Sequence, residues 1–204
     1  MADFSPDFAR ELTYGGTVAG IDEAGRGPWA GPVVAAAVIL DRETIPEKLL
    51  HGLDDSKKLS AKKRELLFAI LPSCATIGVG QAEVAEIDHI NILQATMLAM
   101  RRAFLALDYP ANFALVDGNR APDLPCPVET MVKGDARSLS IAAASIVAKV
   151  TRDHLMAQLA INFPGYGWER NRGYGTAEHK DSLERLGVTP HHRKSFAPIA
   201  ALIS

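Results

Sequence analysis

The sequence is poor in the features that mark secreted, membrane-spanning and disulfide-stapled proteins. It has only two cysteines, Cys74 and Cys126, which lie far apart and lack metal-ligand spacing, so we expect reduced thiols. No apolar run approaches the roughly 20 residues that are needed to span a bilayer. The opening stretch MADFSPDFAR lacks the apolar core of a secretory signal. We therefore expect a cytoplasmic protein without a membrane partner.

The chain also lacks a strong charge of either sign. Its formal net charge is −2, so composition alone does not indicate a nucleic-acid partner. Basic side chains are nevertheless concentrated in two short stretches, KKLSAKKR at residues 57–64 and HHRK at residues 191–194. Each stretch has two interpretations, a solvated face of the protein or a local contact with phosphate groups.

What is present fits a globular α/β protein. The 204 residues suit one domain, or one domain with a small appendage, and 48% of them are hydrophobic. Apolar runs predict strands at residues 17–22, 31–40, 75–82, 112–118 and 128–135. Apolar periodicity predicts helices at residues 90–107, 138–160 and 177–187. Ser138 or Ser140 can cap the second of these helices, and Gly187 can end the third.

The order of these elements indicates how the domain is organised. Strands come early and consecutively and then alternate with helices, which predicts a mixed sheet flanked by helices. After residue 163 the composition changes to glycine and aromatic residues without a clear period. We therefore expect a core at residues 1–160 and a small helical C-terminal appendage at residues 161–204.

Carboxylates stand at the ends of three separate apolar runs. Asp22 and Glu23 follow the first run, Asp117 ends another, and Asp135 lies near the end of a third. Open α/β sheets place their sites where loops leave the strand ends, so these four acids can converge. Like charges at short range repel one another, and a divalent cation removes that conflict. Oxygen-only ligands favour Mg²⁺ or Mn²⁺, and two such ions can hydrolyse a phosphodiester.

Two of these acids, Asp117 and Asp135, also have a structural interpretation. Asp117 in VDGN is a good turn former, and Asp135 in KGDARSLS can cap or precede the following helix. The adjacent pair Asp22 and Glu23 has no comparable structural use, so a functional role is favoured there on the residues alone.

A glycine-rich loop follows the paired acids. Gly25 and Gly27 allow a ligand to approach the backbone closely, and Arg26 can pair with phosphate. A tight hairpin with an exposed arginine is the alternative. A dinucleotide-binding fingerprint is excluded, because three residues separate Gly27 from Gly31 and no helix follows.

Several motifs together resemble the bacterial ribonuclease HII family. They are GIDEAGRGPWAGPVVAAAVIL, DSKKLS, INILQATMLAM, LVDGN, KGDARSLSIAAASIVAKVTRD, NRGYGT and HHRKSF, in the family's order. The resemblance implies a ribonuclease H-like fold with a mixed five-stranded sheet flanked by helices. It also implies a divalent-metal endonuclease that cuts the RNA strand of RNA–DNA hybrids and nicks 5′ to single ribonucleotides in duplex DNA. The products would carry 3′-hydroxyl and 5′-phosphate ends, and the C-terminal appendage would complete the substrate cleft.

The family's site residues carry over onto matching positions. Its metal-binding acids fall on Asp22, Glu23, Asp117 and Asp135, which would hold two Mg²⁺ or Mn²⁺ ions during catalysis. The loop that contacts the ribonucleotide's 2′-hydroxyl falls on Gly25, Arg26 and Gly27. The tyrosine that stacks on the following sugar falls on Tyr174, and Lys57 and Lys58 would approach the backbone phosphates. A 2′-hydroxyl can be read in this way because it both donates and accepts hydrogen bonds.

Other residues stay open at this level. Lys149 and Ser145 could face the duplex or serve packing, and His191, His192 and Arg193 could touch phosphate or only solvent. Lys62, Lys63 and Arg64 are expected on an exposed helix face, and Asp153 is expected to be structural. A zinc site from the histidines lacks cysteine partners. Arg172 replaces a lysine that many family members carry, which keeps the charge but changes the contact geometry.

Two other functions and one related enzyme type are alternatives to a ribonuclease HII. A catalytically silent hybrid-binding module is opposed by the intact acidic set, and a junction nuclease of the same fold class is opposed by the glycine loop and Tyr174. The absence of an additional N-terminal domain disfavours the related type HIII enzymes. A monomer is our expectation for the oligomeric state.

Overall fold

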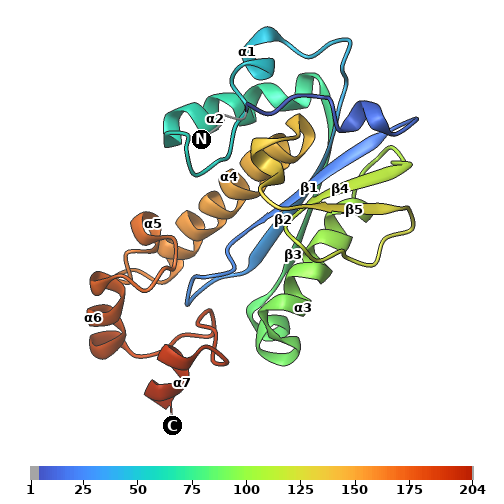
Figure 1. Cartoon of the computed structure of the whole chain (residues 1–204). Helices are drawn as coiled ribbons and strands as arrows, with labels where there is room; N and C mark the ends of the chain where they lie inside the picture. The colour runs from blue at the N-terminus through green and yellow to red at the C-terminus, as the bar shows by residue number, and fades with distance from the viewer. Residues whose placement is uncertain (1–4, 204) are drawn as a thin grey trace.

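A computed structural model describes residues 5–203, which form a mixed five-stranded sheet with helices on both faces (Figure 1). The strand order is β3-β2-β1-β4-β5, and β1 pairs antiparallel with β2 but parallel with β4. The strands are β1 (Val18–Ala24), β2 (Val33–Leu40), β3 (Ala75–Ala82), β4 (Phe113–Asp117) and β5 (Val128–Met131). The predicted mixed sheet is therefore confirmed.

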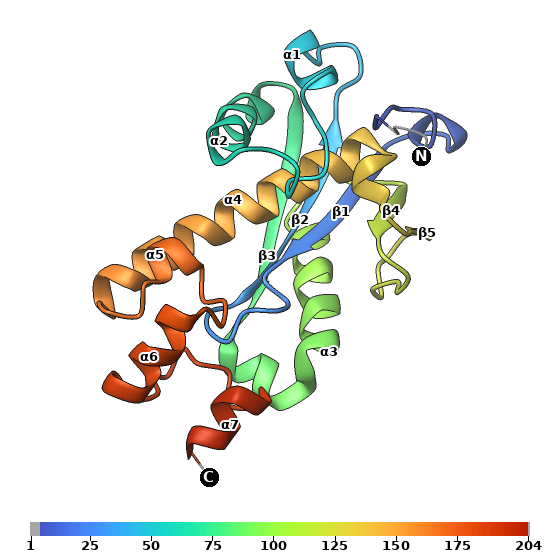
Figure 2. The ribbon, with the colours of Figure 1, turned by 60° about the vertical axis from the view of Figure 1, so that its left-hand side comes forward.

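Helices cover the two faces of this sheet separately. Helix α4 (Leu139–Asn162) packs on β1 and β2 from one side, and α3 (Val84–Leu105) packs on β2 and β3 from the other (Figure 2). The remaining helices are α1 (Glu47–Leu50), α2 (Ala61–Ile70), α5 (Trp168–Asn171), α6 (Ala177–Leu186) and α7 (Ala197–Ile203). Short 3₁₀ turns occur at η1 (Glu11–Thr13), η2 (Leu71–Ser73) and η3 (Gly134–Ala136).

Close packing of α4 onto β1 explains why that strand is rich in small residues. A Cβ atom added at Gly20 would lie 2.1 Å from the backbone carbonyl carbon of Ser140. Alternate residues of a strand point to opposite faces, so Gly20 and Asp22 share the α4 side. Ala19 and Ile21 instead join the apolar cluster beneath α3. The tight contact brings the N-terminal part of α4 against the acidic end of β1.

Two strand boundaries differ from the sequence prediction. The predicted strand at 128–135 is wrong beyond Met131, because Lys133 adopts a left-handed conformation with φ of 56° and the chain turns into η3. Asp135 therefore lies in a 3₁₀ turn and not at a strand end. Strand β1, by contrast, continues through Asp22 and Glu23 to Ala24.

The helix predicted at residues 90–107 is the second part of a longer element. A capping box between Glu83 and Glu86 starts α3 at Val84, before the predicted start. Asn91 then interrupts the helix with φ of 66°, and its side-chain oxygen accepts hydrogen bonds from the backbone N–H groups of Leu93 and Gln94. Asn91 thus acts as an internal N-cap for the predicted segment.

The other predicted helix ends agree closely with the structure. The Ser138 hydroxyl caps α4 by accepting a hydrogen bond from the Ile141 N–H, so Ser138 rather than Ser140 is the cap. Thr176 caps α6 in the same way, and this helix ends at Leu186 with Gly187 following. Cys74 and Cys126 are free thiols.

The segment after α4 folds back over the loop that joins β1 to β2. An apolar cluster formed from both parts contains Ala30, Met156, Tyr166, Trp168, Leu183 and Ile199. The backbone of Arg193 donates to the Trp29 carbonyl, and the backbone of Gly31 donates to the His191 carbonyl. No helix within residues 5–203 is long and apolar enough to cross a membrane.

Candidate active site

Asp22 and Asp117 are neighbours across two parallel strands. Ile21 of β1 is in register with Val116 of β4, and each aspartate is the next residue of its strand. Their side chains therefore leave the sheet on the same face, the one that α4 covers. Glu23 leaves from the opposite face of β1, because consecutive strand residues alternate. The pairing of strand ends thus brings together two acids that are distant in sequence.

The turn before α4 adds the third aspartate to this face. Asp135 sits in η3 and is 6% exposed, and the backbone N–H of Gly134 donates to Asp117 Oδ1 at 2.7 Å. Asp55 approaches Asp135 from the loop before α2, a carboxylate that the sequence analysis did not single out. The signal for Asp55 was its place beside Lys57 in the motif DSKKLS.

Burial and mutual repulsion destabilise the charged forms of the carboxyl groups in this cluster. Burial raises the pKa of Asp22 well above its ordinary value, and the charges of Glu23, Asp117 and Asp135 raise it further. Burial also raises the pKa of Glu23, which Arg26 partly offsets. The pKa of Asp135 rises to about 6 through burial, followed by the charges of Asp55 and Asp117. Such a cluster binds cations favourably, because a cation relieves both causes.

The donor chemistry of the four acids fits a hard divalent cation. All their ligand atoms are carboxylate oxygens, the set that Mg²⁺ and Mn²⁺ prefer. Within residues 5–203, however, no three His, Cys, Asp or Glu side chains are gathered closely enough to hold a metal ion. Other partners occupy the oxygens instead: Asp22 accepts from the Glu23 N–H at 2.6 Å, and Glu23 pairs with Arg26 at 3.2 Å. The cluster would have to draw together around a cation.

A pocket of about 300 Å³ adjoins the acids on the side of the glycine loop. Its lining combines the loop, two lysines and a tyrosine: Glu23, Ala24, Gly25, Arg26, Gly27, Ser56, Lys57, Lys149, Arg152 and Tyr174. Gly25 has φ of 97°, a left-handed conformation that favours glycine. The structure therefore places all three predicted loop residues, Lys57 and Tyr174 around one pocket.

The two predicted phosphate-binding lysines have different surroundings. Burial alone would lower the pKa of Lys57, but the combined charges of Asp22, Asp55, Asp135 and Asp117 raise it. Lys58 instead pairs with Asp54 at 3.0 Å and is absent from the pocket lining. Lys57 is thus the lysine that faces the acidic cluster.

The Tyr174 ring faces the glycine loop, and its backbone carbonyl is held by a buried histidine. The side chain is 46% exposed, and a Cβ added at Gly27 would lie 3.6 Å from its ring. The Tyr174 carbonyl is 2.9 Å from His179 Nδ1, and His179 Nε2 lies 3.1 Å from Trp168 Nε1 and 3.0 Å from His192 Nε2. Thr189 N–H donates to His192 Nδ1. These partners fix both rings as neutral tautomers, with His179 donating from Nδ1 and His192 from Nε2.

The structure decides between the alternatives for Ser145 in favour of packing, and it contradicts the exposed positions expected for three basic side chains. His192 and Arg193 are fully buried, so neither reaches solvent or a phosphate. Ser145 is also buried, where its hydroxyl donates to Ser56 Oγ at 2.7 Å. Arg64 is half-buried rather than on an exposed face, because its guanidinium donates to the carbonyls of Ser56 and Leu59. Arg64 thereby supports the loop that carries Lys57.

Asp153 and Arg172 lie at the rim of the pocket, away from the acidic cluster. Asp153 pairs with Lys149 at 2.8 Å and lies 3.7 Å from Arg172 Nε. Arg172 has φ of 54°, and its buried Nη1 has no hydrogen-bond partner among residues 5–203. Asp153 therefore belongs to an ion-pair network of α4.

The buried histidine pair predicts an acid-sensitive contribution to stability. Burial, together with the neighbouring His179, lowers the pKa of His192 from 6.5 to about 4. The unfolded chain binds that proton near pH 6.5 and the folded chain only near pH 4, so stability is lost as the pH falls between these values. One such proton corresponds to about 1.4 kcal/mol per pH unit.

We expect His192→Gln to flatten this part of the pH profile, because glutamine does not titrate. Urea unfolding at several pH values between 4 and 7 would measure the difference between variant and wild type. The variant must be compared with the wild type because other groups titrate in the same range. Asp22, Glu23 and Asp135 have raised pKa values, so their protonation increases stability as the pH falls, whereas protonation of His192 decreases it. Parallel pH profiles for the two proteins would contradict the prediction.

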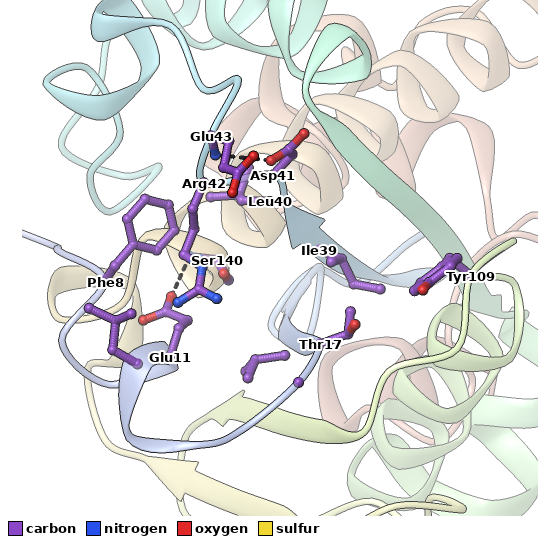
Figure 3. A pocket seen from close by; sticks show the side chains of 13 residues that line it. Phe8, Glu11, Thr17, Ile39, Leu40, Asp41, Arg42, Glu43, Tyr109 and Ser140 are labelled. Atoms are coloured by element: carbon purple, nitrogen blue, oxygen red, sulfur yellow. Dashed lines mark hydrogen bonds between the residues drawn. The ribbon is translucent and has the colours of Figure 1, made fainter.

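A second pocket, larger than the one beside the acids, lies at the opposite end of β1 (Figure 3). It measures about 730 Å³, and Phe8, Glu11, Arg42 and Tyr109 are among its lining residues. Glu11 Oε1 accepts from the Ser138 hydroxyl and the Ser140 N–H, so this buried acid secures the start of α4. The acids of this pocket, Glu11, Asp41 and Glu43, are not accompanied by the Gly25–Gly27 loop or by Tyr174.

Proteins named ribonuclease HII align with this chain over nearly its whole length. Residues 19–199 match the family model described as Ribonuclease HII. The chain is 65% identical over 195 residues to a ribonuclease HII of Paramagnetospirillum magneticum, covering 96% of this chain and 97% of that protein. It is 62% identical over 196 residues to a ribonuclease HII of Rhodospirillum rubrum, covering 95% of this chain and 90% of that protein.

Solved structures agree on the fold. Ribonuclease H2 from Pyrococcus horikoshii superposes with a TM-score of 0.76 at 28% identity, covering 92% of this chain and 97% of that one. Bst-RNase HIII in complex with Mn²⁺ gives a TM-score of 0.75 at 19% identity, covering 92% of this chain and 69% of that one. The predicted ribonuclease H-like fold is confirmed.

Proposed function

The chain belongs to the ribonuclease HII family of endoribonucleases, and we propose that it also nicks duplex DNA 5′ to single embedded ribonucleotides. The observation that carries this proposal is the adjacency of two features. A buried acidic cluster suited to divalent cations directly adjoins a pocket lined by Gly25, Arg26, Gly27 and Tyr174. One feature supports phosphodiester hydrolysis, and the other supports recognition of a ribose.

The chemistry rests on the four acids. Asp22, Glu23, Asp117 and Asp135 would hold two Mg²⁺ or Mn²⁺ ions. When bound, such ions lower the pKa of a coordinated water and stabilise charge on the departing oxygen. The protein's part is to supply oxygen ligands from the end of the sheet and from η3, and to keep them poorly neutralised until a cation arrives.

Recognition of the ribose rests on the loop and the tyrosine. The loop backbone can hydrogen-bond the 2′-hydroxyl, the group that distinguishes RNA from DNA at a single position. The exposed ring of Tyr174 beside Gly27 can stack on the next sugar. Lys57 and Lys149 in the same pocket can contact backbone phosphates, so binding should weaken as salt rises.

A cleavage assay with three duplexes tests the proposal. One duplex carries a single embedded ribonucleotide, one is a continuous RNA–DNA hybrid, and one is all DNA. Each is incubated with Mg²⁺, Mn²⁺ or a chelator. We expect metal-dependent nicking 5′ to the single ribonucleotide and no cutting of the all-DNA duplex. Cleavage of the hybrid alone would refute the single-ribonucleotide activity, and cutting of the all-DNA duplex would favour another nuclease specificity.

Tyr174→Ala is expected to lower kcat/KM on the single-ribonucleotide duplex by about 10- to 100-fold. The expectation follows because aromatic stacking on a nucleotide contributes about 1–3 kcal/mol. Tyr109→Ala is the matched control, since Tyr109 is 58% exposed but lines the pocket at the other end of β1. Equal activities of the two variants in steady-state assays would remove Tyr174 from the substrate site.

A further inference from the structure

Arg193 is buried against the backbone of the loop that adjoins the acids. Its side chain has no exposed surface. Nε and Nη2 donate to the Gly31 carbonyl at 2.9 and 2.8 Å, Nη2 donates to the Gly25 carbonyl at 2.6 Å, and Nη1 donates to the Arg26 carbonyl at 3.0 Å. One guanidinium therefore holds three carbonyls at both ends of the 25–31 loop.

This arrangement is costly for a role in packing alone. Among the described residues, no carboxylate forms a direct ion pair with Arg193; its charge is met by carbonyls, by the Phe196 ring at 5.1 Å and, at longer range, by the charge of Asp88. A buried charge without an ionic partner carries a large desolvation penalty. An apolar side chain would fill the space at lower cost but could not orient three peptide groups.

The segment that carries Arg193 is itself fixed in place. The Arg193 N–H donates to the Trp29 carbonyl at 2.8 Å, which closes a second contact with the loop. Asp88 of α3 accepts from the backbone N–H groups of Lys194 and Ser195 at 3.0 and 2.8 Å. The guanidinium thus acts from a rigid support.

Arg152 of α4 also binds the backbone of this loop. Its guanidinium donates to the carbonyls of Pro32, Ala30 and Arg172, each at 3.0 Å. A Cβ added at Gly25 would lie 2.0 Å from Arg152 Nε, so the loop passes directly over this side chain. Two buried arginines from distant segments therefore fix a loop of few residues.

The peptide geometry turns these contacts into an arrangement of donors. In a trans peptide the carbonyl and the following N–H point in opposite directions. Because the Gly25 and Arg26 carbonyls face Arg193, the N–H groups of Arg26 and Gly27 point away from it. Within residues 5–203, neither of these N–H groups donates a hydrogen bond to the protein. Successive free N–H groups of this kind form a concave site for oxygen atoms.

We propose that Arg193 is a positioning residue for ribose discrimination, which orients the Arg26 and Gly27 N–H groups toward the oxygen atoms of a ribonucleotide. The inference rests on the proposed function and deepens it. Arg193 touches no substrate, and its influence passes through the loop backbone alone. Its loss should therefore weaken discrimination between ribose and deoxyribose more than it weakens general binding to duplex DNA.

The test measures binding with Ca²⁺, on two duplexes that differ only in one 2′-hydroxyl. Fluorescence anisotropy gives Kd for each duplex. Discrimination is measured by the Kd ratio, which is Kd for the all-DNA duplex divided by Kd for the duplex with the ribonucleotide. We expect Arg193→Lys to lower this ratio by about tenfold, because the hydrogen bonds from the Arg26 and Gly27 N–H groups would lose their alignment without being lost altogether. Kd for the all-DNA duplex should change less than twofold, since the pocket lysines are untouched.

Glu11→Gln is the matched control, because Glu11 is a buried charged residue at the far end of β1. It should lose stability and keep the Kd ratio of the wild type. A folded Arg193→Lys variant with an unchanged ratio overturns the inference. If that variant does not fold, Asp88→Ala decides, since it loosens the same segment from a partly exposed position, and an unchanged ratio again overturns the inference. A wild-type ratio of one refutes the proposed ribose recognition itself.

Discussion

Replacing Asp22 with asparagine is expected to reduce metal-dependent cleavage by at least about 10³-fold, because ligand loss removes several kcal/mol of transition-state stabilisation. Asp22 is buried among three other carboxylates, so no neighbour can take over its place. Steady-state cleavage of the single-ribonucleotide duplex in Mg²⁺ and Mn²⁺ measures the loss. Asp117→Asn should behave alike, since Asp117 lies on the same face of the neighbouring strand.

The fold of this variant should stay intact. Burial raises the pKa of Asp22, so the protein already resists a charge at this position, and a neutral amide removes that cost. Thermal unfolding should therefore show a Tm at or above that of the wild type. Asp123→Asn is the matched control, because the Asp123 side chain is 87% exposed and forms a surface ion pair with Arg101. Retained cleavage by a folded Asp22→Asn variant would break the assignment of the acidic cluster.

The second large effect concerns stability. Gly20→Ala is expected to lower the free energy of unfolding by about 3 kcal/mol, at the upper end of the usual cost of overpacking. The added methyl would sit 2.1 Å from the Ser140 carbonyl carbon and 2.3 Å from the Ile141 nitrogen, both backbone atoms. Helix α4 would have to move away from the sheet. Urea unfolding monitored by circular dichroism measures the change.

Gly15→Ala provides the comparison for this substitution. Gly15 precedes β1, and an added Cβ would meet no atom within 4 Å. This variant should unfold within about 0.5 kcal/mol of the wild type, as surface substitutions usually do. Equal unfolding free energies for the two variants would mean that α4 can shift without penalty, contrary to the packing described above.

The apolar patterns predicted most of the sheet and the long helices, because local patterning reflects burial in these elements. Strand β3 agrees with its prediction at residues 75–82, and α4 begins within one residue of the predicted start. Short helices such as α5 and α7 were not predicted, since a turn or two of helix carries no readable period. The predicted strand end at Asp135 failed because a left-handed residue, Lys133, turns the chain earlier.

The candidate acids could be selected from the sequence because unpaired carboxylates at strand ends have few structural uses. The roles of the HHRK stretch could not be selected in this way. A basic cluster reads as a surface feature, yet His192 and Arg193 are fully buried. Arg193 binds backbone carbonyls and His192 binds a second histidine. Every residue has a backbone carbonyl, so a sequence does not show which carbonyls a side chain will bind.

The sequence by itself determined the fold class and the family and selected four candidate acids, since these depend on residue types in a fixed order. Only the tertiary structure decided which acids share a face, how the loop is held and which lysine faces the site. Those features depend on strand register and on long-range contacts, such as that between Arg193 and the Gly25 carbonyl. A contact across most of the chain arises from chain folding, and no local pattern encodes it.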